Sequence, residues 1–391
     1  MLTTVGDTLS NPKTVLTWVM SYVGAPVSLI SLIVPVRESG SMLPQIFLSY
    51  YVRTKSVRKW IWVFGSLAQS AAVMGIGYIA LNFQGATAGW LMIVCLIFFS
   101  LARAFCSLTS KDVLGKTIPK TRRGKLKGYT VAVSGVLVTA SGIIVAYRTQ
   151  VEQDIWFYAG IIFFAASLWI LAAAIYAAIK EFPGDSLGSN TAKPNVFEKL
   201  NLIRTDKPFR NFIVARSLLL CSALTAPFYV VLAQEYLGKD GEILGSFIVA
   251  NGLASMLSAP AWGRFADKSS KQVMVWAALI AAIMGIFIFG VVTLSITARS
   301  WFWLYPIAFF LLNVAHNGVR LGRKTYVVDM ATGNKRSDYV AVSNTVIGVI
   351  LLITGGVSAL ISLISVEGVI LVLSLFGFAG AWSSFRLPEV E

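Results

Sequence analysis

Ionisable side chains inside long apolar stretches are the residues of this chain best suited to do chemistry. They are Asp7, Lys13, Arg37, Glu38, Arg103, Arg216, His316 and Arg320. Burying a charge in hydrocarbon costs roughly 3 kcal/mol or more unless the charge faces a partner or a water-filled cavity. These residues therefore predict a polar path through the apolar part of the molecule, with solute binding, proton transfer or ion pairing as its chemistry.

The position of each charge favours a different role. Lys13 is too deep in its stretch to reach the surface easily, which favours a functional role. Asp7 is only one or two turns inside, so an interfacial position stays open. Arg37 and Glu38 are adjacent, so their side chains leave a helix in different directions, and we expect one to face a cavity and the other a neighbouring helix. Structural pairing and function both stay open for these two residues.

Basic side chains outnumber acidic ones among the buried charges. Guanidinium groups pair well with carboxylate and phosphate oxygens, and a cavity lined by them concentrates positive potential. We therefore predict an organic anion or zwitterion as the bound solute, with Arg216 as a contact in the second half. Arg320 lies near the end of its stretch and could instead be an interfacial anchor.

His316 is the single histidine of the chain. Its pKa range suits a proton relay, and a polar contact between helices is equally possible. It has no Cys or His partner at metal-ligand spacing, so we predict no metal site. The chain also has no Gly-rich phosphate loop and no paired catalytic groups, so we predict neither a cofactor nor an enzyme.

The elements that position these residues are apolar blocks of about 20 residues, the length of a membrane-spanning helix. Apolar residues make up 56% of the chain and charged residues 13%. Alternating strands typical of a β-barrel are absent, so we predict an all-α polytopic membrane protein. Its twelve expected spans are residues 3–22, 27–50, 60–82, 88–110, 128–148, 155–179, 210–234, 243–263, 272–295, 300–320, 339–364 and 367–386.

Lys and Arg collect in the loops after spans two, four, eight and ten. The loop after span four has six of them between residues 116 and 127, and the loop after span ten includes Arg323 and Lys324. Positive loops stay cytoplasmic, so both termini are predicted to be cytoplasmic. This topology explains most of the net charge of +15, and we predict no nucleic-acid partner.

The longest polar segment divides the chain into related halves. We expect a six-helix bundle over residues 1–179, a cytoplasmic middle loop over 180–209 and a second six-helix bundle over 210–391. Val-Ala-Val-Ser opens span five at residues 131–134 and span eleven at residues 340–343. A short match at equivalent places indicates an internal repeat.

The stretch Gly-Arg-Phe-Ala-Asp-Lys-Ser-Ser-Lys at residues 263–271 is a polar turn after span eight. With two sets of six spans and a cytoplasmic middle loop, this motif resembles the major facilitator superfamily of secondary transporters. The resemblance implies that Gly263 lets neighbouring helices approach closely. It also implies that Asp267, Lys268 and Lys271 make cytoplasmic gating contacts, although an ordinary solvated turn is the simpler alternative.

The first-half counterpart at residues 49–59 departs from this motif. Ser49 stands in the glycine position and Arg53 in the position of the acid. Asp338 at the start of span eleven could pair with Arg53 and form a charge-swapped gate. Arg53 could equally be a positive interfacial anchor.

In this superfamily the first, fourth, seventh and tenth helices line the central path, where most of the candidate charges fall. Arg103 corresponds to a span-four arginine that the family associates with proton coupling. The resemblance thus implies an alternating-access transporter, with Asp7 or Glu38 carrying protons in symport. Drug or metabolite efflux by proton antiport is the alternative, although span five lacks the proline of the antiporter motif, and a channel or receptor is less favoured.

The expected setting is the lipid bilayer of a bacterial inner membrane, because the loops are compact. We expect a monomer whose partners are a small solute and protons. Cys95, Cys106 and Cys221 all fall within spans and are expected to be reduced packing residues.

Overall fold

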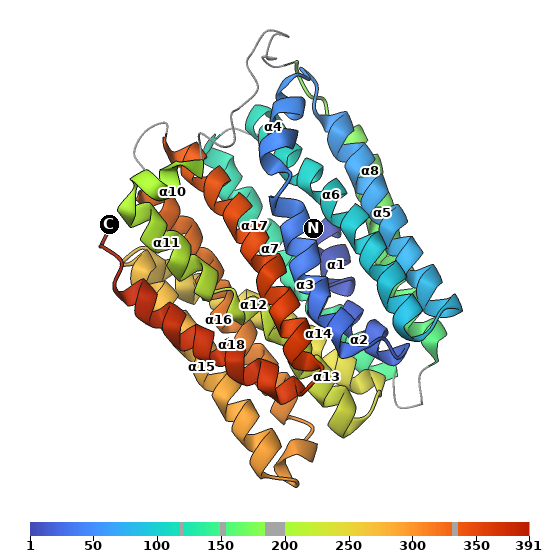
Figure 1. Cartoon of the computed structure of the whole chain (residues 1–391). Coiled ribbons are helices and arrows are strands. Elements are labelled where there is room, and N and C mark those ends of the chain that lie inside the picture. Colours follow the sequence, from blue (N-terminus) through green and yellow to red (C-terminus); the bar gives the residue numbers. More distant parts are fainter. Residues whose placement is uncertain (118–119, 149–153, 184–199, 331–334, 391) are drawn as a thin grey trace.

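The computed structural model describes residues 1–117, 120–148, 154–183, 200–330 and 335–390. Inside these ranges the side chains of some residues, most of them at 120–128 and 335–338 and with Arg53 and Asp338 among them, lie outside the description. Long helices run roughly along one direction, and the regular elements of the described residues are all helical (Figure 1). The predicted all-α membrane fold is confirmed.

The helices of the first half lie mostly within the expected spans. They are α1 (Leu2–Leu9), α2 (Val15–Tyr22), α3 (Val27–Met42), α4 (Gln45–Arg53), α5 (Lys59–Asn82), α6 (Gly85–Thr117), α7 (Lys120–Arg148) and α8 (Ile155–Ala177).

The second half begins with short helical pieces and continues with long helices. Its elements are α10 (Leu202–Thr205), α11 (Lys207–Leu218), α12 (Cys221–Leu224), α13 (Ala226–Leu237), α14 (Gly241–Ala266), α15 (Ser270–Leu294), the 3-10 turn η1 (Ala298–Ser300), α16 (Leu304–Asp329), α17 (Lys335–Ser362) and α18 (Val366–Phe385).

Eight helical segments of the described residues are long and apolar enough to cross a membrane. They are Lys59–Asn82, Gly85–Leu114, Ile155–Ala177, Lys207–Leu237, Gly241–Ala266, Ser270–Leu294, Tyr339–Ser362 and Val366–Phe385. The count of twelve, the cytoplasmic termini and the division into two bundles stay predictions.

Breaks interrupt spans that we expected as continuous helices. Pro12 lies between α1 and α2, and Pro44 lies between α3 and α4. Proline lacks an N–H donor and its ring obstructs the preceding turn, so it ends a helix. At the first break the carbonyl of Asn11 accepts bonds from the N–H groups of Thr14 and Leu16, which satisfies part of the exposed backbone.

Helix α16 is longer than predicted, because it continues to Asp329 rather than ending near residue 320. Arg323 and Lys324 therefore lie on a helix and not in the expected loop. The apolar run of the sequence ends at the first charged residues, whereas the backbone hydrogen bonds of the helix continue past them. This difference adds two further turns of polar helix beyond the apolar part of the span.

Helices of the two halves pack closely at two places, α3 against α17 and α7 against α14. A Cβ added to Gly355 would lie 2.3 Å from Cγ of Pro35, and one added to Gly245 would lie 2.5 Å from the backbone nitrogen of Ala146. A Cβ on Gly142 would approach Val249 to 2.8 Å. Small residues let helix backbones touch directly at these seams.

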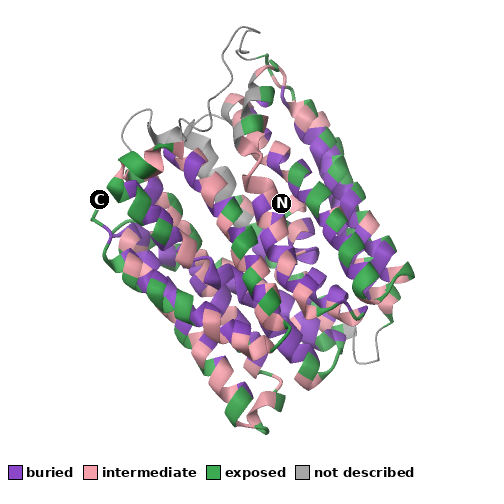
Figure 2. Ribbon diagram, in the orientation of Figure 1, coloured by how far each residue is buried: buried purple, intermediate pink, exposed green. Residues whose placement is uncertain are grey.

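The outward faces of the helices are apolar although they are exposed. Exposed residues follow the outer surfaces of helices such as α5 and α15 (Figure 2). Phe64 and Trp276 are examples, with 68% and 54% of their surface exposed. An apolar surface of this extent is unsuited to water and fits the hydrocarbon of a bilayer.

Candidate functional site

One carboxylate of the first half holds two guanidinium groups. Nη2 of Arg37 on α3 donates a hydrogen bond to Oδ1 of Asp7 on α1 at 3.0 Å. Nη1 of Arg103 on α6 donates to the same oxygen. Three helices are thus joined by a single acid, which remains partly accessible with 24% of its side chain exposed.

Glu38 extends this arrangement. Its Oε1 lies 3.6 Å from Nη1 of Arg37, so these neighbours are close enough to pair. Which surface each of them faces stays a prediction. The ring of Phe99 lies beneath both arginines, with its centroid 5.4 Å from Cζ of Arg37 and 6.0 Å from that of Arg103, a favourable cation–π geometry.

Lys13 lies in the break between α1 and α2, where its backbone N–H donates to Oδ1 of Asn11 at 2.8 Å. Its ammonium group interacts electrostatically with Glu38 in the first half and with Arg320 and Arg323 in the second. Among the described residues no carboxylate lies within ion-pair distance of it. The break thus brings a cation of the first half towards α16.

Helix α16 contributes His316, Arg320 and Arg323, which are spaced four and three residues apart and so share one face. Nδ1 of His316 lies 3.2 Å from Oγ of Ser222 on α12. Arg320 is exposed and its Nη2 lies 3.4 Å from Oδ1 of Asn317. Nε of Arg323 is buried and has no hydrogen-bond partner in the part of the chain that the structure describes.

Sequence reasoning missed Arg323 because the expected span ended at Arg320. The signal was present, since the spacing from His316 through Arg320 to Arg323 continues one helical face. We call Lys13, Arg37, Arg103, Arg320 and Arg323 the basic cluster. Asp7 and Glu38 are the acidic residues that interact electrostatically with cations of the basic cluster.

Arg216 occupies a separate place on α11. It is buried, and its guanidinium donates to Oγ of Ser343 at 2.6 Å and to Oδ1 of Asn344 at 2.8 Å, both on α17. Asn344 in turn lies 3.4 Å from Oε1 of Gln45 on α4. Arg216 therefore links helices of the second half and, through Asn344, reaches the first, so an anion contact at this residue remains a hypothesis.

The motif at residues 263–271 lies at the junction of α14 and α15. A Cβ on Gly263 would meet no described atom within 4 Å, so the close approach that the resemblance implied is not seen at this glycine. Asp267 and Lys268 are exposed. Nζ of Lys271 lies 2.9 Å from Oε1 of Glu389, beyond α18.

The predicted contact between Arg53 and Asp338 lies outside the described residues, because the side chains of both are outside the description. The charge-swapped gate between them stays a hypothesis. The equivalent end of the first half has a different network, which sequence reasoning missed: Arg58, Lys116, Asp112 and Glu181 form connected ion pairs and hydrogen bonds.

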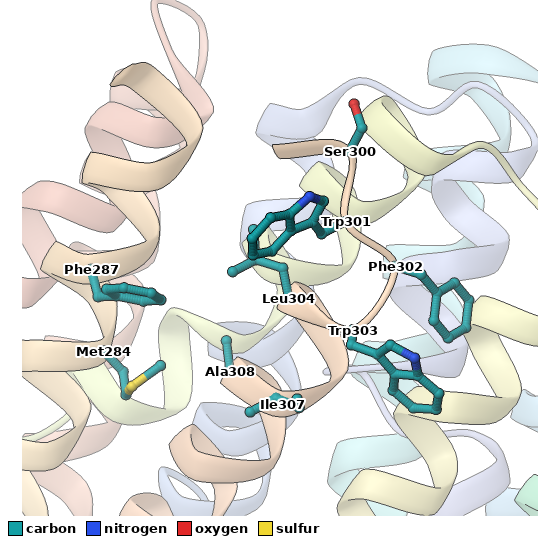
Figure 3. Close-up of a pocket in the computed structure, with 9 residues that line it drawn as sticks. All are labelled: Met284, Phe287, Ser300, Trp301, Phe302, Trp303, Leu304, Ile307 and Ala308. Carbon is teal, nitrogen blue, oxygen red and sulfur yellow. The ribbon is translucent and has the colours of Figure 1, made fainter. Parts of the chain in front are cut away.

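Two cavities occur elsewhere in the molecule. One of about 580 Å³ lies between α15 and the start of α16, where Trp301, Phe287 and Ile307 gather around an apolar space (Figure 3). The other, of about 570 Å³, is lined by residues that include Tyr22, Gln84 and Asp154. Neither contains a residue of the basic cluster, so the candidate site rests on the charges and not on these cavities.

Comparison with known proteins agrees with the fold. Residues 212–391 match the family model described as Major Facilitator Superfamily. No protein of curated function matches the chain in sequence. The family model thus supports, over the second half of the chain, the resemblance expected from the motif at residues 263–271 and from the span pattern.

Solved transporter structures are similar over almost the whole chain. A D-xylose-proton symporter has 13% identity and a TM-score of 0.75, with 100% of this chain and 97% of that chain covered. A POT family transporter in complex with 5-aminolevulinic acid has 12% identity and a TM-score of 0.73, covering 97% and 93%. The nucleoside transporter NupG has 12% identity and a TM-score of 0.71, covering 99% and 98%.

These similarities confirm the predicted resemblance. The chain is a multi-pass membrane protein with the fold of the major facilitator superfamily, a class of membrane transporters. At 12–13% identity, the similarity of the solved structures extends to the fold and not to the solutes named for those proteins.

Proposed function

We propose that this protein is an alternating-access secondary transporter that moves a small organic anion or zwitterion together with protons. The observation that carries the proposal is the position of Asp7, whose one oxygen is shared by Arg37 and Arg103 within a transporter fold. A carboxylate held between two arginines controls how much positive charge is available to a solute.

The proposed coupling follows from competition for the two guanidinium groups. Ionised Asp7 neutralises part of their charge and occupies their hydrogen bonds. A proton on Asp7 removes that charge, so Arg37 and Arg103 become free to bind anionic oxygens of the solute. Release of the solute lets Asp7 lose the proton and pair again. Glu38, which lies 3.6 Å from Arg37, is the second candidate for the proton carrier.

Alternating access requires contacts between the halves to break at one end and form at the other. Nε2 of Gln234 donates to the carbonyl of Trp18 at 3.2 Å, and Nζ of Lys239 donates to that of Ser21 at 2.9 Å. We propose that these bonds between α13, its following loop and α2 break when that end opens. Gly263, Asp267, Lys268 and Lys271 remain the proposed gating residues of the other end.

Counterflow in proteoliposomes tests transport itself, because a carrier accelerates exchange of labelled for unlabelled solute and a pore does not. A panel of anionic, zwitterionic and neutral metabolites identifies the exchanged solute. No accelerated exchange for any solute that binds the purified protein would contradict the carrier proposal and favour a receptor or channel.

Asp7→Asn tests the proton coupling. We expect this variant to lose uphill uptake driven by a pH gradient while it retains exchange at equilibrium, because the amide cannot carry a proton. Glu38→Gln is the matched variant, with the same change at the second carboxylate. Normal gradient-driven uptake by Asp7→Asn would remove Asp7 from the mechanism. If solute entered the vesicles only while protons left them, the protein would be an antiporter and efflux would be favoured.

A further inference from the structure

Three cations of the basic cluster, Lys13, Arg320 and Arg323, have no acidic partner among the described residues. Asp7 binds Arg37 and Arg103, and Glu38 lies beside Arg37. Within the described ranges Lys13, Arg320 and Arg323 have no carboxylate at ion-pair distance, and of these three only Arg320 is exposed. Nε of Arg323 is buried without a hydrogen-bond partner. Keeping a partly buried cation of this kind unpaired is costly, so its site favours a counter-charge.

Lys13 and Arg323 come from opposite halves, and their positive charges repel one another. Lys13 lies in the break that precedes α2, whereas Arg323 lies on α16. Arg323 and Arg320 both interact electrostatically with Lys13, and Glu38 interacts with Lys13 and Arg323. One carboxylate between several cations leaves the region with an excess of positive charge. An anion placed there would relieve the repulsion among them.

The helix break adds a polar group beside Lys13. Thr14 precedes the first residue of α2, and its Oγ1 is buried without a described partner. The positive end of the helix dipole lies at the same place. Interrupted membrane helices commonly bind charged solutes at their broken ends, because backbone groups there are not used by the helix.

We infer that the transported solute is an organic dianion whose two anionic groups are bound in different halves of the molecule. The first group is held by Lys13 with Thr14 at the break, and the second by Arg323 with Arg320 on α16. Dicarboxylates and phosphate monoesters both have this chemistry. The inference rests on the proposed function and narrows its solute class.

The arrangement explains why a second charge matters. A solute with one anionic group can satisfy the cation of one half and leaves the other unpaired. A dianion satisfies both, so its second charge contributes directly to affinity. Charge-assisted hydrogen bonds are strong enough for one such contact to change affinity about tenfold.

Ligand-induced thermal stabilisation of the purified full chain at constant ionic strength tests this inference. The probes are succinate, its monoamide succinamate and the neutral diamide succinamide, which have similar shape and decreasing charge. Glycerol 3-phosphate with glycerol as its neutral control forms the second series. We expect a dianion to bind about tenfold more tightly than its less charged analogues, and the preferred series distinguishes a dicarboxylate from a phosphate monoester.

Variants assign the preference to the two cations. Lys13→Gln and Arg323→Gln should each reduce dianion binding to the affinity of the monoanion, whereas Arg323→Lys should retain a preference for the dianion. Arg210→Gln removes the same charge from an exposed position on α11 and should change nothing. Elution of each variant as a single species in size-exclusion chromatography verifies folding, and Arg323→Lys tests the site if Arg323→Gln does not fold.

Equal affinity for succinate, succinamate and succinamide, with no preference in the phosphate series, would overturn the inference. Unchanged dianion preference in Lys13→Gln or Arg323→Gln would overturn it as well. Counterflow of a neutral or singly charged solute alone would overturn the dianion inference and leave the transporter proposal intact. Dianion binding without accelerated exchange would instead contradict the transporter proposal and leave the binding site intact.

Discussion

The two halves end with similar contacts that differ in burial. In the first half Glu181, which follows α8, accepts hydrogen bonds from the N–H groups of Arg58 and Lys59 at the start of α5. In the second half Glu389, which follows α18, contacts Ser269 and Lys271 at the start of α15. Each acid ties the last helix of its half to an earlier helix.

The burial of Glu181 and Glu389 decides how strongly each of them stabilises its helix contacts. The side chain of Glu181 is fully buried and also pairs with Lys116 at 3.0 Å. The side chain of Glu389 is 55% exposed, so water competes for it. Buried charge networks are costly to break, whereas exposed pairs contribute little. We infer that the end of the first half is rigid and that of the second half is easier to rearrange.

The largest expected effect comes from Glu181→Ala. Removing this carboxylate leaves two backbone N–H groups without their acceptor and takes one of its two carboxylate partners from the Lys116 ammonium. This should lower the free energy of unfolding by about 3 kcal/mol. Thermal unfolding in detergent measures the change. Glu389→Ala is the matched variant, and an equal loss in both would contradict the difference between the halves.

Asp112→Asn should have an intermediate effect. Asp112 pairs with Arg58 and with Lys116, the latter at 3.1 Å, but 30% of its side chain is exposed. We expect a loss of about 1.5 kcal/mol in the free energy of unfolding, because the amide keeps one acceptor and loses the charge. Thermal unfolding of this variant beside Glu181→Ala gives the comparison. A loss larger than that of Glu181→Ala would make Asp112, and not Glu181, the centre of the network.

The smallest effect is expected for the pair of Lys271 and Glu389. A double-mutant cycle of Lys271→Gln and Glu389→Gln should give a coupling energy of about 0.5 kcal/mol or less, because solvent screens the exposed acid. Thermal unfolding of the four proteins supplies the cycle. A coupling energy as large as the loss measured for Glu181→Ala would mean that both ends are equally fixed.

The sequence predicted long helices better than it predicted contacts. The expected span 60–82 agrees closely with α5, and 155–179 agrees with α8, because continuous apolar character is a property of the segment itself. Charged residues within the spans also pointed to the site, and the acids Asp7 and Glu38 do meet Arg37 there.

Other features depend on which helices become neighbours and could not be derived from hydropathy. Glu181 lies in a short polar stretch, and only the packing of α5, α6 and α8 buries it. The sharing of Asp7 by two arginines needs the relative rotation of three helices. Arg323 was missed for a different reason, since helix α16 continues after the apolar pattern ends.

The glycine seams between the halves also restrict how the protein can move. At Gly355 and at Gly245 the partner helix leaves no room for even one additional carbon atom. Sliding one helix along the other would press larger neighbouring side chains into these contacts, whereas tilting about them leaves the contact in place. We therefore propose that the α3–α17 and α7–α14 seams act as pivots, whose position would set the axis about which one half rocks against the other.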